Sequence, residues 1–215
     1  LKTGDKEVVI EVALLERLFA ALNKGEPART VSVSKEEEPL ARALQLITRK
    51  PMLYVANTDD PTPGKPNPHV DAVRAMAAAE GAAVVELSCK TEAEIMELED
   101  EAEQQMFLAE LGLTESGLDR LAKAAFHLLG LQTYFTAGVK EARAWTIRQG
   151  WTAPQAAGVI HTDFERGFIK AEIYHCDDLF SAGTEVAVAA AGKKRVEGKE
   201  YVMRDGDVVH FRFNV

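Results

Sequence analysis

The clearest pattern in the chain is a pair of short apolar runs, each followed directly by polar residues. Residues 51–56 are rich in strand-forming side chains and lead into a polar turn at residues 57–60. Residues 83–87 form a second apolar run, and the apolar spacing of residues 69–80 between the two runs predicts a helix. This order predicts part of an α/β sheet, with polar loops at the carboxyl ends of its strands, where such sheets bind ligands.

Helical spacing also dominates the residues before this segment. Apolar side chains recur at helical positions in residues 5–23, and this predicted helix has no obvious partner nearby in the sequence to cover its apolar stripe. Ser34 and Glu37 have the spacing of a capping box, in which each side chain satisfies a free backbone donor at a helix start. We therefore expect a second helix that begins at this box and runs through Ile47.

Helical spacing returns after the second apolar run. Thr91 and Glu94 again have capping-box spacing and predict the start of a strongly acidic helical stretch. Gly112 is expected to end this stretch, and residues 116–130 predict a further helix that stops at a glycine.

The pattern changes near Gly130. Short apolar runs bounded by Gly, Asp or Pro replace the helical spacing, and they predict strands at residues 131–136, 142–148, 168–174 and 208–213. A short helix fits residues 154–160, because Pro154 suits a first helical turn. Strands arranged around one helix predict a small mixed sheet, so we place a domain boundary near Gly130.

Charge is distributed unevenly along the 215 residues, whose net charge is −9. The acidic excess lies in residues 1–130, which excludes a general nucleic-acid surface there, since binding to a polyanion needs clustered cations. Residues 131–215 are balanced overall but contain a basic cluster of Lys193, Lys194 and Arg195. Such a run is usually solvated surface, and it is also the best candidate for contact with RNA phosphate.

Other residue types narrow the possible classes of protein and of functional site further. The sequence contains no run of about 18 apolar residues, so it predicts no membrane-spanning helix. Its first residues are unlike a signal sequence. Cys89 and Cys176 give neither a disulfide framework nor metal spacing, which favours the reducing cytoplasm. We interpret His161 and Asp163 as a turn-stabilising pair, so no catalytic residue is assigned. The other histidines have no metal-ligand spacing, and no metal site is expected: His69, His127, His175 and His210.

The two polar loops resemble the base-reading motifs of P-loop GTPases, Asn-Lys-x-Asp and Ser-Ala-Lys. A carboxylate at Asp60 can accept two hydrogen bonds from the N1 and N2 edge of guanine, whereas adenine presents an acceptor at N1. A backbone N–H near Cys89 can donate to a purine oxygen, and the stem of Lys90 can lie along the ring, which Thr58 cannot do. An ordinary polar turn is the alternative. The candidate base-binding residues are Asn57, Thr58, Asp60, Ser88, Cys89 and Lys90.

Four long strings beyond Gly130 carry a more specific resemblance, at residues 132–138, 144–148, 153–168 and 204–215. They resemble the TGS domain that closes the Obg-like ATPase (YchF) family of P-loop NTPases. The resemblance implies a ubiquitin-like β-grasp fold for residues 131–215.

The preceding residues resemble the same family. Residues 1–30 are similar to the end of the helical, coiled-coil insertion of its G domain, and residues 31–130 to the last part of that domain, with its base-reading loops. The implied fold class is α/β, a partial P-loop NTPase sheet with a helical insertion and a carboxyl-terminal β-grasp domain. The sequence has no Gly-x-x-x-x-Gly-Lys-Ser/Thr string, and the nearest candidate is Gly64 with Lys65. We therefore expect the carboxyl-terminal part of a longer protein, or one whose other part is not seen here.

The resemblance also implies an activity and partners. The family usually has Glu at the position of Asp60 and prefers ATP, so we expect ATP or GTP as the nucleotide, with ATP favoured. Full-length members hydrolyse the nucleotide, with Mg²⁺, whereas this chain is expected to be inactive alone because it lacks the P-loop. The implied partner is the ribosome, through its large subunit or RNA, bound by a cytoplasmic monomer. The alternative is a non-catalytic module that binds RNA or the ribosome through the TGS domain.

Overall fold

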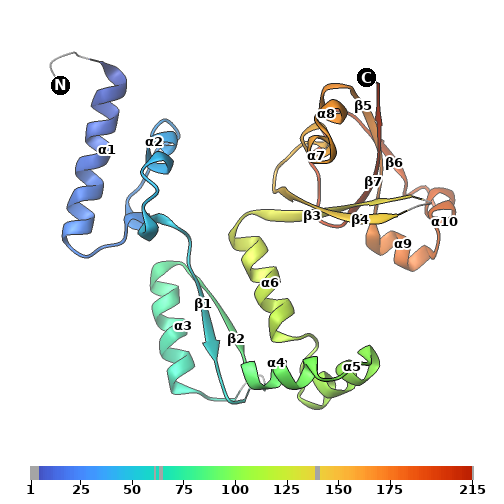
Figure 1. Ribbon diagram of the computed structural model, residues 1–215, viewed down its shortest axis with the longest axis horizontal. Coiled ribbons are helices and arrows are strands. Elements are labelled where there is room, and N and C mark those ends of the chain that lie inside the picture. The colour runs from blue at the N-terminus through green and yellow to red at the C-terminus, as the bar shows by residue number, and fades with distance from the viewer. Residues whose placement is uncertain (1–4, 61, 63–64, 139–140, 215) are drawn as a thin grey trace. The chain divides into compact units, whose positions relative to one another are not determined.

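The computed structural model describes residues 5–60, 62, 65–138 and 141–214. Gly64, part of the nearest P-loop candidate, lies outside the described residues. The chain divides into two compact units, Leu1–Gly117 and Leu118–Val215, and each is described by itself. Figure 1 shows their helices and strands. None of the helices within the described ranges is both long and apolar enough to cross a membrane.

The first unit opens with helix α1, Lys6–Asn23, which confirms the predicted helix. Asp5 caps it by accepting a 3.0 Å hydrogen bond from the N–H of Glu7. Leu14 and Leu18 on one side of the helix are buried against Ala28 and Ala41, so the segment that follows α1 covers part of its apolar stripe.

The predicted second helix is shorter than expected. The capping-box hydrogen bonds form, with Ser34 N–H donating to Glu37 Oε2 at 2.8 Å and Glu37 N–H donating to Ser34 Oγ at 3.3 Å. Helix α2, Glu38–Ala43, nevertheless begins only after this box, with Glu37 as its N-cap, and ends before Ile47, which is 79% exposed. Gln45 has a φ of +48°, a left-handed conformation that interrupts a right-handed helix. Two 3₁₀ turns flank α2: η1, Ala28–Thr30, and η2, Ile47–Arg49.

The strand–helix–strand prediction is confirmed. Strand β1, Leu53–Asn57, pairs in parallel with β2, Ala83–Leu87, and helix α3, Pro68–Glu80, connects them (Figure 1). The register places Asn57 opposite Leu87, so both strands end at the same edge. Alternate residues of β2 are buried, including Val85 and Leu87, as expected for a strand with one covered face.

The acidic stretch after β2 is two helices rather than one, α4, Cys89–Met96, and α5, Glu101–Glu110. The predicted capping box at Thr91 was wrong, because α4 starts earlier. Ser88 is its N-cap and accepts a 3.2 Å hydrogen bond from the N–H of Thr91. Helix α6, Gly117–Leu128, follows as predicted.

The second unit contains a five-stranded mixed sheet in the order β4-β3-β7-β5-β6. The four predicted strands and the short helix are confirmed, while β6 and three helices were not predicted. The strands are β3, Leu131–Ala137; β4, Ala142–Arg148; β5, Phe168–His175; β6, Arg195–Glu197; and β7, Asp207–Phe213. The helices are α7, Ala153–Ile160; α8, Thr162–Arg166; α9, Cys176–Ala182; and α10, Glu185–Ala190.

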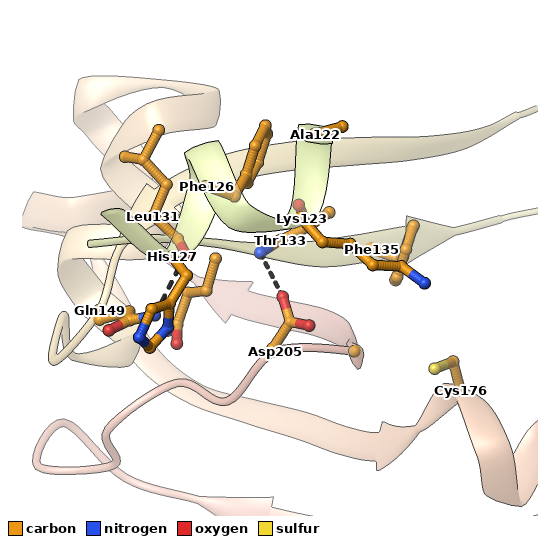
Figure 2. Close-up of a pocket in the computed structure, with 12 residues that line it drawn as sticks. Ala122, Lys123, Phe126, His127, Leu131, Thr133, Phe135, Gln149, Cys176 and Asp205 are labelled. Carbon is orange, nitrogen blue, oxygen red and sulfur yellow. Dashed lines mark hydrogen bonds between the residues drawn. The ribbon is translucent and has the colours of Figure 1, made fainter. Parts of the chain in front are cut away.

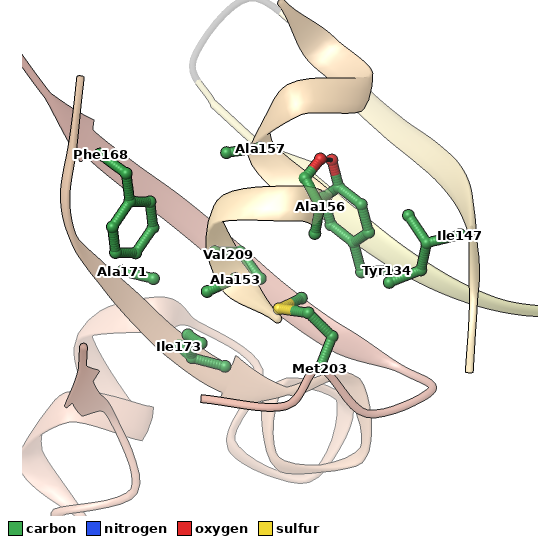
Figure 3. Packing of buried hydrophobic residues seen from close by; sticks show 10 residues of the cluster. All are labelled: Tyr134, Ile147, Ala153, Ala156, Ala157, Phe168, Ala171, Ile173, Met203 and Val209. Carbon is green, nitrogen blue, oxygen red and sulfur yellow. Dashed lines mark hydrogen bonds between the residues drawn. The ribbon is translucent and has the colours of Figure 1, made fainter. Parts of the chain in front are cut away.

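Helix α7 lies over one face of this sheet, and their contact forms the core (Figure 3). The three alanines of α7 are fully buried, which lets the helix approach the strands closely. Tyr134 of β3 is also fully buried, and its hydroxyl donates a 2.9 Å hydrogen bond to the carbonyl of Ala156. A sheet grasping one helix is the arrangement expected of the predicted β-grasp fold.

Candidate functional site

Parallel pairing brings the two predicted base-reading loops together. Because Asn57 lies opposite Leu87 in the register, the loop after β1 adjoins the first turn of α4. The side-chain oxygen of Asn57 accepts a 3.0 Å hydrogen bond from the N–H of Cys89. Asn57 therefore joins the two loops directly, across 32 positions of sequence.

Asp60 presents a carboxylate whose surroundings keep it ionised. Its Oδ1 accepts a 2.9 Å hydrogen bond from the N–H of Thr62, and its Oδ2 pairs with the ammonium group of Lys65. The bond from Lys65 and the bonds from Thr62 hold the pKa of Asp60 well below its usual range. A carboxylate has about four lone-pair sites, so the two oxygens retain capacity to accept further donors.

Thr58 supports the first loop from within. Its N–H donates a 2.9 Å hydrogen bond to the carbonyl of Leu87, and its Oγ1 donates to the carbonyl of Asp60 at 3.1 Å. Its short side chain therefore fixes the loop conformation.

The second loop is organised by the start of α4. Ser88 is 1% exposed and serves as the N-cap, so its hydroxyl orients the first turn of the helix. The N–H of Cys89 is bonded to Asn57. The N–H of Lys90 has no acceptor among the residues that the structure describes. The Lys90 side chain is 83% exposed, with its Nζ 3.8 Å from Glu94 Oε1, so the length of its stem is accessible.

These six residues suit recognition of a planar base. Asp60 offers acceptors for ring and amino N–H groups, and the Lys90 N–H at a helix start is a donor for a carbonyl or ring nitrogen. The exposed stem of Lys90 adds an apolar surface.

The basic cluster comprises two residues of the turn after helix α10 and the first residue of strand β6, and each of its cations is near a carboxylate. Lys193 pairs with Asp178 at 2.5 Å. Lys194 pairs with Glu172 at 3.0 Å and with Glu185 at 2.9 Å. Arg195 lies over the ring of Tyr201 at 5.6 Å, with carboxylate oxygens of Glu197 and Asp207 at 3.8 and 4.0 Å. These pairs reduce the local positive potential.

His161 and Asp163 form the predicted turn. The N–H of Asp163 donates to His161 Nδ1 at 3.2 Å, which caps α8, and the Asp163 carboxylate pairs with Arg166 at 2.6 Å. Both groups therefore serve the local fold.

A cavity of about 540 Å³ lies within the second unit, between α6, β3 and the loop before β7 (Figure 2). Two of its polar side chains are already bonded: Asp205 Oδ1 accepts from the N–H of Thr133 at 2.7 Å, and Gln149 Nε2 donates to the carbonyl of Leu131 at 3.3 Å. Cys176 lies at its edge.

Sequence reasoning missed one group of side chains at the junction of β5 and α9. His175, Cys176 and Asp177 each bring a metal-ligating atom to within 4.8 Å of the others. Three consecutive residues match no standard ligand spacing. One feature of the sequence could have indicated this group, namely its position at the end of a predicted strand. Where the strand ends and the chain turns, neighbouring side chains no longer alternate and can lie on the same side.

Comparison with known proteins supports the predicted resemblance. The family model YchF-GTPase_C, described as "Protein of unknown function (DUF933)", matches residues 131–214. The chain is 51% identical over 216 residues to a protein of Bacillus subtilis (strain 168) named ribosome-binding ATPase YchF. It is 49% identical over 214 residues to the protein of that name in Escherichia coli O157:H7. All of this chain is covered in both alignments, and the chain spans 59% and 58% of the two relatives' lengths.

A solved structure supports the same conclusion. The Schizosaccharomyces pombe YchF GTPase superimposes with a TM-score of 0.78 at 35% identity, covering 93% of this chain and 53% of that one. A GTP-binding protein from Pyrococcus horikoshii OT3, at 17% identity and a TM-score of 0.54, shares the fold. The resemblance to the YchF family is therefore confirmed, with the whole chain aligning to its curated members and residues 131–214 matching its family model.

Proposed function

We propose that the loops after β1 and β2 bind the base of a purine nucleotide, ATP or GTP, within a ribosome-associated nucleotide-binding protein. The observation that carries this proposal is the hydrogen bond between Asn57 and Cys89, which holds both loops at one edge of the parallel strands. In this proposal Asp60 accepts from the base, the Lys90 N–H donates to it, and the Lys90 stem covers the ring. Thr58 and Ser88 position these groups.

The choice between ATP and GTP depends on Asp60. Relatives are named either ATPase or GTPase, so their names leave both nucleotides in the proposal. An ionised carboxylate at Asp60 favours guanine, which offers two donors, over adenine, which presents an acceptor at N1. The side chain of Thr58 is too short to cover either base. We retain ATP as the favoured nucleotide, as the family resemblance implies, with GTP as the competitor.

The test compares the dissociation constants of ATP and GTP for the chain and for Asp60→Glu. If Asp60 reads the base, the ratio of the two constants changes severalfold, because the longer side chain moves the acceptor atoms. Asp59→Glu is the matched control, since Asp59 neighbours Asp60 and lies on the same exposed turn. An unchanged ratio in Asp60→Glu would show that Asp60 does not read the base.

Hydrolysis in this proposal requires a phosphate-binding loop and Mg²⁺ in addition to the base site. This sequence has no P-loop string, so the chain is proposed to bind a nucleotide weakly and not to turn it over.

The proposed partner is the ribosome, because curated relatives are named ribosome-binding. We assign the chain to a cytoplasmic protein that binds the ribosome as a monomer, through the large subunit or its RNA. Lys193 is the member of the basic cluster best placed for phosphate, since its side chain is 55% exposed. Sedimentation with ribosomes at rising salt tests this: Lys193→Glu should weaken binding and lower the salt dependence, whereas Lys199→Glu serves as control. If both variants bind the ribosome equally, Lys193 is not part of the interface.

A further inference from the structure

We propose that strand β4 binds an extended acidic peptide of a partner protein, which adds to the sheet of the second unit as a further strand. This interaction is separate from the proposed base site. The sheet order β4-β3-β7-β5-β6 leaves β4 and β6 as the two edge strands. Strand β6 has three residues, whereas β4 has seven (Figure 1). Of the two edges, β4 is therefore the one long enough to pair with a peptide.

Two hydrogen bonds at the ends of the β3–β4 ladder show which residues of β4 bond to β3. The N–H of Gln149 donates to the carbonyl of Gly130 at 2.8 Å, and the N–H of Gly138 donates to the carbonyl of Glu141 at 2.9 Å. Both pairs continue the register of the two strands. Hydrogen-bonded and non-hydrogen-bonded pairs alternate along an antiparallel ladder. Every second residue from Glu141 to Gln149 therefore bonds to β3.

The residues between them direct their backbone groups away from the sheet. Trp145 belongs to the bonded set, whereas Ala144 and Thr146 point their N–H and C=O groups outward. The N–H groups of Ala144 and Thr146 have no acceptor within the part of the chain that the structure describes. The open edge ends at Arg148, whose carbonyl accepts the N–H of Trp151 at 3.3 Å. Outward donors and acceptors in this pattern are what an added strand bonds to.

Trp145 forms a fixed apolar surface beside the open edge. Ile147 points into the core beneath helix α7 (Figure 3), and alternate residues share a face of the sheet, so Trp145 and Arg143 lie on that side too. Trp145 Nε1 donates a 2.9 Å hydrogen bond to Thr136 Oγ1, and its ring stacks with that of Tyr134 at a centroid distance of 6.5 Å. An added strand can therefore pack an apolar side chain against a ring that is already held in place.

The charges of β4 favour an acidic peptide. The strand contains two cations, Arg143 and Arg148, and no carboxylate. Both side chains are exposed, and neither forms an ion pair with any residue that the structure describes. The guanidinium of Arg143 lies 4.2 Å from the ring centroid of Trp145 instead. Carboxylates on an added strand can reach both cations, whereas each cation of the basic cluster already has a carboxylate nearby.

A second copy of the chain and an RNA strand fit this edge less well. Pairing β4 with β4 of another copy would bring only arginines together as charged groups, and like charges on paired strands are destabilising. RNA phosphates could accept from Arg143 and Arg148, but they do not match the alternating donors and acceptors of Ala144 and Thr146 as a peptide backbone does. An acidic peptide satisfies both the backbone and the cations.

The first test follows amide hydrogen exchange in the whole chain by NMR. The probe is a capped peptide as long as β4, made of alternating valine and glutamate, and the same peptide with lysine for glutamate is its control. In the free chain, Ala144 and Thr146 should exchange fast and Trp145 slowly. With about nine-tenths of the chain occupied by the acidic peptide, exchange at Ala144 and Thr146 should slow by about tenfold. The proposal is overturned if the acidic peptide does not bind, binds no better than the lysine peptide, or leaves both amides fast.

Thr146→Pro tests the backbone pairing. Proline removes the outward N–H of Thr146 without removing a bond to β3, which is the position that edge strands tolerate. The dissociation constant of the acidic peptide should rise by about threefold or more. Thr146→Ala keeps the N–H and should stay within about twofold of the parent. Tryptophan fluorescence in urea shows whether the proline variant is folded, and equal binding by the two folded variants would refute strand addition.

Arg148→Glu tests the charge and leaves the backbone unchanged. It should weaken binding of the acidic peptide by about threefold or more. Lys170→Glu is the matched control, because Lys170 is exposed and its strand β5 is separated from β4 by β3 and β7. Equal weakening by both reversals would reduce the effect to net charge and overturn the proposal. An oligouridylate that displaces the peptide, and whose own binding Thr146→Pro leaves unchanged, would assign the edge to RNA instead.

Discussion

The side-chain oxygen of Asn57 accepts the backbone N–H of Cys89 at 3.0 Å, and this bond joins the ends of two parallel strands. The N–H belongs to the first turn of α4, which would otherwise leave it without an intrahelical partner. One asparagine thus satisfies a helix start and links both candidate base-reading loops.

Asn57→Ala should loosen the second loop without unfolding the chain. Losing one exposed hydrogen bond reduces local stability by about 0.5–1 kcal/mol, which corresponds to a roughly two- to fivefold faster amide exchange. Hydrogen exchange followed by NMR should show this acceleration at Cys89. Asp59→Ala, on the same turn, is the control, and equal exchange in both variants would contradict the assigned role of Asn57.

Tyr134→Phe should destabilise the second unit by about 1–2 kcal/mol, because it leaves the buried carbonyl of Ala156 without the tyrosine donor. The chain's two tryptophans, Trp145 and Trp151, both lie in this unit, so their fluorescence during urea unfolding reports on it specifically. Tyr54→Phe removes a hydroxyl bonded to Glu80 in the other unit, and it should leave the tryptophan transition unchanged. A transition equally unaffected by Tyr134→Phe would refute the prediction.

Glu172 should make the second unit more stable at neutral than at acid pH. Bonds from Lys194 and Arg212 lower its pKa from the ordinary 4.5 to about 2. Since the folded-state pKa is the lower one, the stabilisation is complete above about pH 4.5 and is lost as the pH falls towards about 2. Glu172→Gln should therefore be less stable than the parent by about 1 kcal/mol at pH 7, with a smaller difference at pH 3. Glu200→Gln removes the same charge at an exposed position and is the matched control.

Gly206 and Gly183 offer a matched pair for the cost of an added Cβ. Both have a left-handed φ, +81° and +78°, so alanine at either adds about 1–2 kcal/mol of strain. Of the two glycines, only Gly206 would bring the new Cβ against other side chains, those of His175 and Cys176. Gly206→Ala should therefore shift the tryptophan unfolding transition more than Gly183→Ala, and the reverse order would contradict the packing described here.

Local patterns predicted the regular elements well. The apolar runs of β1, β2 and the central strands of the second unit were evident because each buries alternate or consecutive side chains. The parallel ends of β1 and β2 then followed from the intervening helix. The proximity of Asp60 and Lys90 to a common edge was predictable for the same reason.

Features set by competing interactions were not predictable. Ser88 caps α4 and Thr91 does not, because Ser88 lies closer to the strand end and starts the helix first. Ser34 makes the hydrogen bonds of its box, but they close a turn before α2, whose N-cap is Glu37. The helix expected through Ile47 is interrupted at Gln45, whose conformation no residue preference required. The ion pairs of Lys194 with Glu172 and Glu185 join elements far apart in sequence, so the run of cations gave no sign of them.

The most direct test of the proposed base site is an amide NMR titration of the chain with ATP and with GTP at millimolar concentrations. If both loops read the base, the shift changes concentrate at residues 57–60 and 88–90 and saturate with either purine nucleotide. They should be much smaller in Asp60→Ala, while Asp59→Ala behaves as the parent. Shift changes spread evenly over the chain, or centred away from both loops, would show that these loops do not bind the base.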